Sequence, residues 1–235
     1  HEVYGGEFSP RLYGIYHLSD SWVLKGGAGK AFKAPDITQS DDSYSVLACR
    51  GMCQIVGNPD LKPETSVSYE LGTLFQDQRV EAGIMFFNND IEDMIVSDSW
   101  RAGHRPKVMT YSNVSQARVQ GYELQGRYAF NDALAARANY TYADGEDRDT
   151  GKPLNNTPQH VANLGLDWQA LSQLGLNLDY QYTGSQMLVV PAKSASFESG
   201  AYATLSLGGT FQATKELALA ASMASHGDNR LASLT

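Results

Sequence analysis

The stretch "NLGLDWQALSQLGLNLDYQYT" (163–183) decides the fold, because it alternates apolar and polar residues on both sides of a short polar turn. Every second residue is apolar, in the order Leu164, Leu166, Trp168, Leu174, Leu176, Leu178, Tyr180 and Tyr182. The residues between them are mostly polar or glycine. Because successive side chains of a strand point to opposite faces, this pattern predicts two antiparallel strands with one apolar and one polar face.

The same alternation recurs along the chain, while helical periodicity is nearly absent. It predicts about ten strands, centred near 11–18, 22–32, 65–76, 79–90, 114–130, 133–143, 160–169, 173–185, 201–213 and 216–224. Five connections are short, at 19–21, 77–78, 131–132, 171–173 and 214–216. The four that intervene are long, at roughly 33–64, 91–113, 144–159 and 186–200. This strict alternation is typical of an antiparallel up-and-down transmembrane β-barrel, with short periplasmic turns and longer extracellular loops.

The two faces of the predicted strands suit a membrane better than a soluble core. The polar faces carry many charges, at Glu70, Glu81, Glu123, Arg127, Arg137, Asp167 and Asp179. Such a face fits the wet lumen of a large barrel, and lipid allows only helices and closed barrels because every backbone polar group must be paired. Aromatic residues cluster towards strand ends, as an interfacial girdle would, at Trp22, Tyr140, Tyr142, Trp168, Tyr180 and Tyr182. A soluble β-sandwich is the alternative, and it gives no reason for the alternation of loops.

The composition excludes several other classes. The 235 residues could form one large all-β domain or two ordinary domains, and the formal net charge is −8. We expect no nucleic-acid partner, because the sequence has no basic stripe. No run of 18 apolar residues is present, so a transmembrane helix is not expected, and no signal peptide opens the chain. The closing stretch "SHGDNRLASLT" (225–235) is predicted to be a loop, so we expect this chain to be part of a barrel.

Enzyme chemistry finds little support. The histidines at 17, 104, 160 and 226 lack the spacing of metal ligands, and no Gly-x-Ser-x-Gly nucleophile motif occurs. We therefore expect neither catalysis nor a metal site. Cys49 and Cys53 are the only cysteines, and their spacing suits neither a four-ligand zinc site nor a Cys-x-x-Cys redox motif. A small disulfide loop in an oxidising compartment is favoured, with two free thiols as the alternative.

The stretch "NPDLKPET" (58–65) separates the longest loop from a regular strand. Pro59 and Pro63 each fix their own φ and bias the preceding residue towards extended geometry, so they stiffen the return of the loop. Glu64 and Thr65 are then predicted to begin a strand whose apolar face meets lipid. We interpret the proline pair as structural.

Several motifs resemble one family over nearly the whole chain. They are "GGEFSPRLYGIYHLSDSWVLKGGAGKAFKAPD" (5–36), "CRGMCQIVGNPDLKPETSVSYELG" (49–72), "FFNNDIEDMI" (86–95), "YSNVSQARVQGYELQGRY" (111–128), "GKPLNNTP" (151–158) and "GDNRL" (227–231). They are similar to the C-terminal half of TonB-dependent outer-membrane receptors. The likeness is greatest to the catecholate-siderophore group, which includes the colicin I receptor and ferric enterobactin receptors.

The resemblance implies a 22-stranded barrel in the bacterial outer membrane, plugged by an N-terminal domain that carries a TonB box. Residues 1–235 would be part of that barrel, with the plug domain and the final strand absent. The function implied is TonB-energised import of a ferric catecholate siderophore, with no covalently bound cofactor. Outer-membrane lipid and lipopolysaccharide would surround the barrel. Colicins or phages could also bind to its loops. A passive porin-like or structural barrel is the alternative.

The segment "SWRAGHRPKVMTY" (99–111) is the candidate ligand-binding site. A ferric tris-catecholate is a multiply charged anion with aromatic faces, so a receptor needs cationic and aromatic side chains at its mouth. This segment is locally basic in an acidic protein, and its candidate ligand-binding residues are Trp100, Arg101, His104, Arg105, Lys107 and Tyr111.

Overall fold

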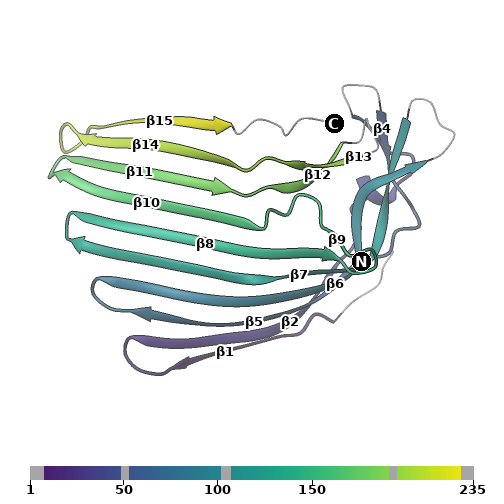
Figure 1. The fold of residues 1–235 in the computed structure, drawn as a ribbon, viewed down its shortest axis with the longest axis horizontal. Coiled ribbons are helices and arrows are strands. Elements are labelled where there is room, and N and C mark those ends of the chain that lie inside the picture. Colours follow the sequence, from purple (N-terminus) through teal and green to yellow (C-terminus); the bar gives the residue numbers. More distant parts are fainter. Residues whose placement is uncertain (1–7, 49–52, 102–106, 191–194, 229–235) are drawn as a thin grey trace.

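The computed structural model describes residues 8–48, 53–101, 107–190 and 195–228. Along these residues one sheet contains a meander of ten strands, each hydrogen-bonded to the next (Figure 1). They are β1 (Arg11–His17), β2 (Trp22–Lys33), β5 (Glu64–Gln76), β6 (Val80–Arg101), β7 (Lys107–Asn131), β8 (Leu134–Asp147), β10 (His160–Leu171), β11 (Leu174–Thr183), β14 (Tyr202–Gln212) and β15 (Ala218–Asp228). All neighbours on this path are antiparallel, which confirms the predicted up-and-down order.

The five predicted short turns lie together at one end of the sheet (Figure 1). The turn between β5 and β6 shows how they close: the carboxylate of Asp77 accepts hydrogen bonds from the backbone N–H groups of Arg79 and Val80, each at 2.8 Å. A short side chain that bonds to the backbone two or three residues on stabilises such a tight turn. We call the opposite end of the sheet the long-loop end.

The strand register confirms the predicted division of side chains into two faces. Leu166 lies opposite Ala136 on β8 and Leu178 on β11, and Leu178 lies opposite Leu207 on β14. Arg137, Asp167 and Asp179 occupy the alternate positions of the same strands, so they lie on the other face.

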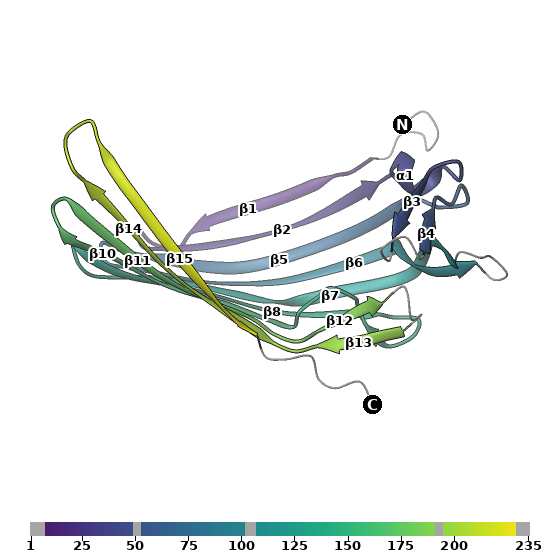
Figure 2. The same cartoon turned by 90° about the horizontal axis from the view of Figure 1, so that it is seen from above.

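The apolar face has no second layer of protein over it among the elements that the structure describes (Figure 2). Its side chains are therefore exposed: Leu71 by 57%, Phe86 by 53% and Leu164 by 53%. A soluble protein rarely leaves so extended an apolar surface uncovered, whereas lipid covers it in a membrane. Figure 2 shows the sheet curved into an open trough, with β1 and β15 as its two edges.

Aromatic side chains mark where the apolar face ends. On three adjacent strands, Phe86 lies opposite Tyr122, which lies opposite Tyr142, and the next row towards the long-loop end holds Asn88, Gln120 and Asp144. The ring centroids of Tyr122 and Tyr142 are 5.6 Å apart, and those of Tyr142 and His160 are 5.4 Å apart. Such a row fits the interfacial aromatic girdle that the sequence predicts. We call the row of Phe86, Tyr122, Tyr142 and His160 the aromatic row.

Two of the predicted loops are wrong in conformation. The sequence predicts a long loop at roughly 91–113, but β6 continues to Arg101 and β7 begins at Lys107. Beyond the aromatic row a strand no longer separates lipid from lumen, so period-two alternation fails there. Val108 and Met109 are both buried, for example, although they are consecutive. The closing stretch is also partly a strand, since β15 continues to Asp228, while residues 229–235 lie outside the described residues.

The other long connections contain short elements that the sequence did not indicate. The first holds α1 (Ile37–Ser40), β3 (Ser45–Ala48) and β4 (Cys53–Val56). The later ones hold β9 (Lys152–Pro153), β12 (Gln186–Val190) and β13 (Ala195–Ser199). These pieces are too short for a periodic pattern to identify them.

Candidate ligand-binding site at the long-loop end

A small apolar core lies at the long-loop end, although the sheet itself is a single layer. It combines side chains from three segments that are distant in sequence. Cys53 and Met109 are 1% exposed, Leu61 is 3%, Val108 is 7% and Ile95 is 9%. The long connection between β2 and β5 is therefore packed against the extended ends of β6 and β7.

A parallel pair of strands joins these segments. β4 runs alongside the first residues of β7, with Cys53 opposite Lys107 and Val56 opposite Thr110. The Thr110 hydroxyl adds a hydrogen bond of 3.0 Å to the backbone oxygen of Val56. This pairing places the N-terminal end of β4 next to the N-terminal end of β7.

Asn58 continues the attachment just after β4. Its Nδ2 donates a hydrogen bond of 2.9 Å to the backbone oxygen of Tyr111. Its Oδ1 accepts one of 3.1 Å from the backbone N–H of Asp60, which closes a local turn. Its backbone N–H donates a hydrogen bond of 2.6 Å to the backbone oxygen of Gln39, so Asn58 is also bonded to the end of α1.

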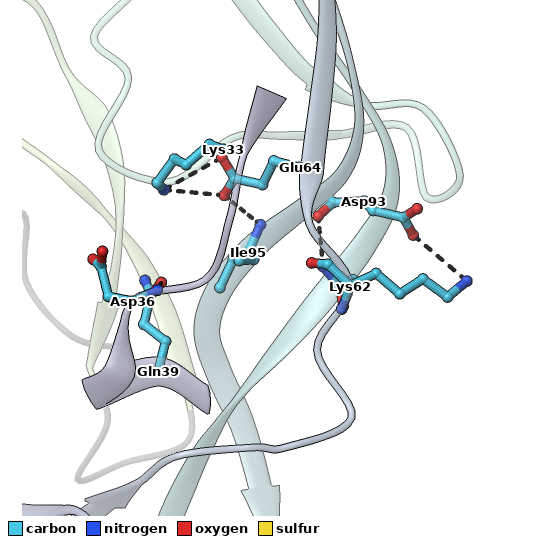
Figure 3. Close-up of polar contacts among 8 residues, drawn as sticks. Lys33, Asp36, Gln39, Lys62, Glu64, Asp93 and Ile95 are labelled. Carbon is cyan, nitrogen blue, oxygen red and sulfur yellow. Dashed lines mark hydrogen bonds and ion pairs between the residues drawn. The ribbon is translucent and has the colours of Figure 1, made fainter. Parts of the chain in front are cut away.

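Asn113 of β7 makes a second attachment. Its Oδ1 accepts a hydrogen bond of 2.9 Å from the backbone N–H of Lys62, and its Nδ2 donates to the backbone oxygens of Lys62 (3.0 Å) and Asp93 (2.6 Å). Asp93 has a φ of 55°, in the left-handed region that few residues other than glycine adopt. The Lys62 ammonium lies 3.9 Å from the Asp93 carboxylate (Figure 3).

Glu64 ends this series of contacts. Its side chain is only 15% exposed, and it accepts a hydrogen bond of 2.8 Å from the backbone N–H of Ile95. The Lys33 ammonium lies 3.3 Å from both of its carboxylate oxygens (Figure 3). β5 begins at Glu64, as the sequence predicts. Hydrogen bonds and ion pairs thus join residues 58–64 to α1, β2, β6 and β7.

Four of the six predicted ligand-binding residues lie on the paired ends of β6 and β7: Trp100, Arg101, Lys107 and Tyr111. Trp100 and Arg101 are the last two residues of β6, and their backbones lie opposite Met109 and Val108 of β7. The side chains of Trp100, Arg101 and Lys107 are outside the described part of the structure, as are the whole residues His104 and Arg105. Tyr111, on β7, is half-buried. The binding role of all six residues therefore stays a prediction.

Cys53 is disulfide-bonded and buried at the start of β4. Its predicted partner, Cys49, lies outside the described residues, so the Cys49–Cys53 pairing also stays a prediction. Sequence reasoning missed the asparagines of the site, Asn58 and Asn113. The motif "NPDLKPET" contains Asn58, but its prolines alone predict no more than a stiff loop.

The polar face of the sheet carries a charge network of its own. Arg137 is ion-paired with Asp179 and lies 3.7 Å from Asp167. Asn177 donates a hydrogen bond of 2.9 Å to the second carboxylate oxygen of Asp179. A polar hollow of about 210 Å³ lies beside them. Arg137 thus offsets part of the negative charge of Asp167 and Asp179 on this face.

Within the described ranges, no group of three or more His, Cys, Asp or Glu side chains is placed to hold a metal ion. No helix among these residues is long and apolar enough to cross a membrane.

The family model of the TonB-dependent receptor-like β-barrel matches residues 2–224. The chain belongs to this family. It is therefore part of a β-barrel of the bacterial outer membrane, and the long-loop end is the external end. The predicted family and fold class are confirmed.

Relatives in this family carry siderophore-receptor names. The ferric enterobactin receptor of Pseudomonas aeruginosa is 31% identical over 98% of this chain and 34% of its own length. The ferrienterobactin receptor of Escherichia coli K12 is 28% identical over 98% of this chain and 33% of its own length. The chain thus spans about a third of the length of the relatives it matches.

Solved structures agree with this likeness. A variant of the ferric enterobactin receptor PfeA from Pseudomonas aeruginosa has a TM-score of 0.75 at 29% identity, over 94% of this chain and 35% of that one. The siderophore receptor PirA from the same organism has a TM-score of 0.68 at 26% identity, over 96% and 43%.

Proposed function

We propose that this chain forms part of an outer-membrane receptor that binds ferric catecholate siderophores and imports them with energy supplied through TonB. The observation that supports this most is the position of residues 99–101 and 107–111. The backbones of Trp100, Arg101, Lys107 and Tyr111 lie on the paired ends of β6 and β7, beyond the aromatic row and so outside the membrane. Receptor function, and not catalysis, is proposed for the same site.

The chemistry of the segment fits the proposed ligand. Arg101, Arg105 and Lys107 attract an anion, and Trp100 and Tyr111 offer faces on which catechol rings can stack. The chain as a whole carries a net charge of −8, whereas residues 99–111 contain three basic residues and no acidic one. The names of the enterobactin-receptor relatives support the same ligand class.

Two further partners follow from this proposal. TonB would act through the plug domain that the resemblance implies outside this sequence. Outer-membrane lipid would contact the apolar face up to the aromatic row. Lipopolysaccharide would contact the charged residues just beyond that row.

The test measures binding of a ferric catecholate to the full-length protein, with a triple variant in which Arg101, Arg105 and Lys107 are replaced by Ala. Each exposed charge contributes little by itself, because salt screens it over a Debye length of about 8 Å at physiological ionic strength. The triple variant should therefore bind more weakly than any single variant, and the deficit should shrink as salt rises. The control is Arg79→Ala with Lys215→Ala, which removes two positive charges at the opposite, short-turn end; it is compared with the double variant in which Arg101 and Lys107 are replaced by Ala.

Equal affinity of the triple variant and the wild type at low salt would contradict the proposed site. The alternative function, a passive porin-like barrel, is separated by uptake in cells that lack TonB. An energised importer loses uptake in those cells, whereas a passive pore keeps it.

A further inference from the structure

We infer that Asn58 is a positioning residue for ligand binding, which holds Tyr111 in place through the backbone of β7. This inference rests on the proposed function, because it assumes that Tyr111 contacts the ligand. The link itself is the hydrogen bond of 2.9 Å from Asn58 Nδ2 to the Tyr111 backbone oxygen, between residues 53 positions apart in the chain.

Tyr111 lies where the ladders on both sides of it are interrupted. On the β6 side, Val96 lies opposite Ser112 and Ser99 lies opposite Thr110, so the register shifts at Tyr111. On the β4 side, the parallel ladder ends with Val56 opposite Thr110. Tyr111 thus lies at a β-bulge on the β6 side and just past the end of the ladder on the β4 side.

Asn58 lies two residues after Val56, where the parallel ladder ends. The next residue after Val56 is Gly57, whose backbone N–H donates to the oxygen of Tyr44 at 3.3 Å. The side-chain amide of Asn58 then supplies the donor to Tyr111. A side-chain donor at a ladder end can replace a backbone one, because buried carbonyl groups are generally paired.

The second bond of Asn58 fixes the direction of that donor. Its Oδ1 accepts from the backbone N–H of Asp60, so the amide is held at both its oxygen and its nitrogen. Pro59 follows directly and restricts Asn58 to extended backbone geometry. The amide is thereby oriented before any ligand arrives, and a preorganised residue loses less entropy on binding.

The experiment uses Asn58→Asp in the full-length protein. Aspartate keeps the oxygen that bonds to Asp60 and has nearly the same shape, but it lacks the Nδ2 donor. The matched control is Gln54→Glu, which makes the same amide-to-carboxylate change on β4, where Gln54 lies opposite Val108. Hydrogen exchange of the amides of residues 108–113 is measured first, without ligand. Faster exchange is expected in Asn58→Asp than in the control.

Ferric-catecholate binding is then compared in a double-mutant cycle with Tyr111→Ala. Loss of one hydrogen bond in the site should weaken binding by about three- to tenfold in Asn58→Asp, with the thermal midpoint of the barrel unchanged. The same substitution should have little further effect when Tyr111 is already Ala, because the two residues act together.

Each failure has its own signature. Unchanged exchange in Asn58→Asp would overturn the inference without any ligand. Normal binding by Asn58→Asp together with weakened binding by Tyr111→Ala would also overturn it, while leaving the proposed site intact. Normal binding by Tyr111→Ala would instead remove Tyr111 from the proposed site, and the role of Asn58 would fall with it.

Discussion

The backbone of Gly121 lies so close to the backbone of Tyr142 that residue 121 has no room for a side chain. A Cβ atom at residue 121 would overlap the backbone oxygen of Tyr142 and would lie 2.9 Å from its carbonyl carbon. These are residues of the neighbouring strands β7 and β8, at the level of the aromatic row. Close approach of two backbones is one of the few places where glycine is required.

Gly121→Ala should therefore lower the free energy of unfolding by about 1–3 kcal/mol, because one strand must move to admit the methyl group. Gly126→Ala is the control on the same strand, since its Cβ would meet nothing nearer than 3.8 Å. We expect Gly126→Ala to change the free energy by less than about 0.5 kcal/mol. Equilibrium urea unfolding in phospholipid vesicles compares them, and equal stability of the two variants would contradict the geometry.

The assignment of faces gives a second prediction. Leu164 lies on the apolar face and is 53% exposed, while its neighbour Asn163 lies on the polar face. Leu164→Arg should destabilise the folded barrel by about 2–4 kcal/mol, because it places a charge in lipid. Asn163→Arg should have a much smaller effect, since its side chain faces water. The same unfolding measurement applies, and similar losses for the two variants would reverse the assignment.

The third prediction concerns pH. Asp90 lies beyond the aromatic row, and the hydrogen bond from Arg118 Nε, 2.6 Å long, lowers the pKa of its carboxyl group. A carboxyl group with a lowered pKa stabilises the fold above its ordinary pKa of about 3.9, and this contribution is lost as the pH falls through the lowered value. Both side chains are about a third exposed, so we expect no more than about 1 kcal/mol from the pair.

Arg118→Gln should thus be less stable than the wild type at pH 7, and the difference should shrink as the pH falls below 4. Arg127→Gln serves as the control on the same strand. Arg127 is exposed, and its guanidinium has no hydrogen bond or ion pair within the described part of the chain. A difference for Arg118→Gln that is constant from pH 7 to pH 3 would show that Asp90 is not involved.

The disulfide supplies the fourth prediction. Peptide mass mapping without reductant should find Cys49 and Cys53 in one linked peptide. The ring is small, so its removal should change the free energy of unfolding only modestly and loosen mainly the β3–β4 hairpin. Two free thiols after export would refute the pairing.

The sequence by itself determined the order of the ten strands and, in their membrane-spanning part, the face on which the side chains lie. Leu164 and Asp167 could be assigned to opposite faces without coordinates, because the direction of a side chain in a strand depends only on whether its position is odd or even. The alternation of short turns and long loops likewise needed no tertiary information. Lipid on one side and water on the other impose this regularity along the whole membrane-spanning part.

Only the tertiary structure decided how the external end is built. No alternation of apolar and polar residues indicates that β6 and β7 continue or that Asn58 bonds to Tyr111. Beyond the aromatic row both faces of a strand can contact protein, so the alternation is lost. Asn58 meets Tyr111 only because β4 pairs in parallel with β7 and its ladder stops one residue short. Local sequence cannot specify which two loops will touch, since that depends on the curvature and register of the strands that carry them.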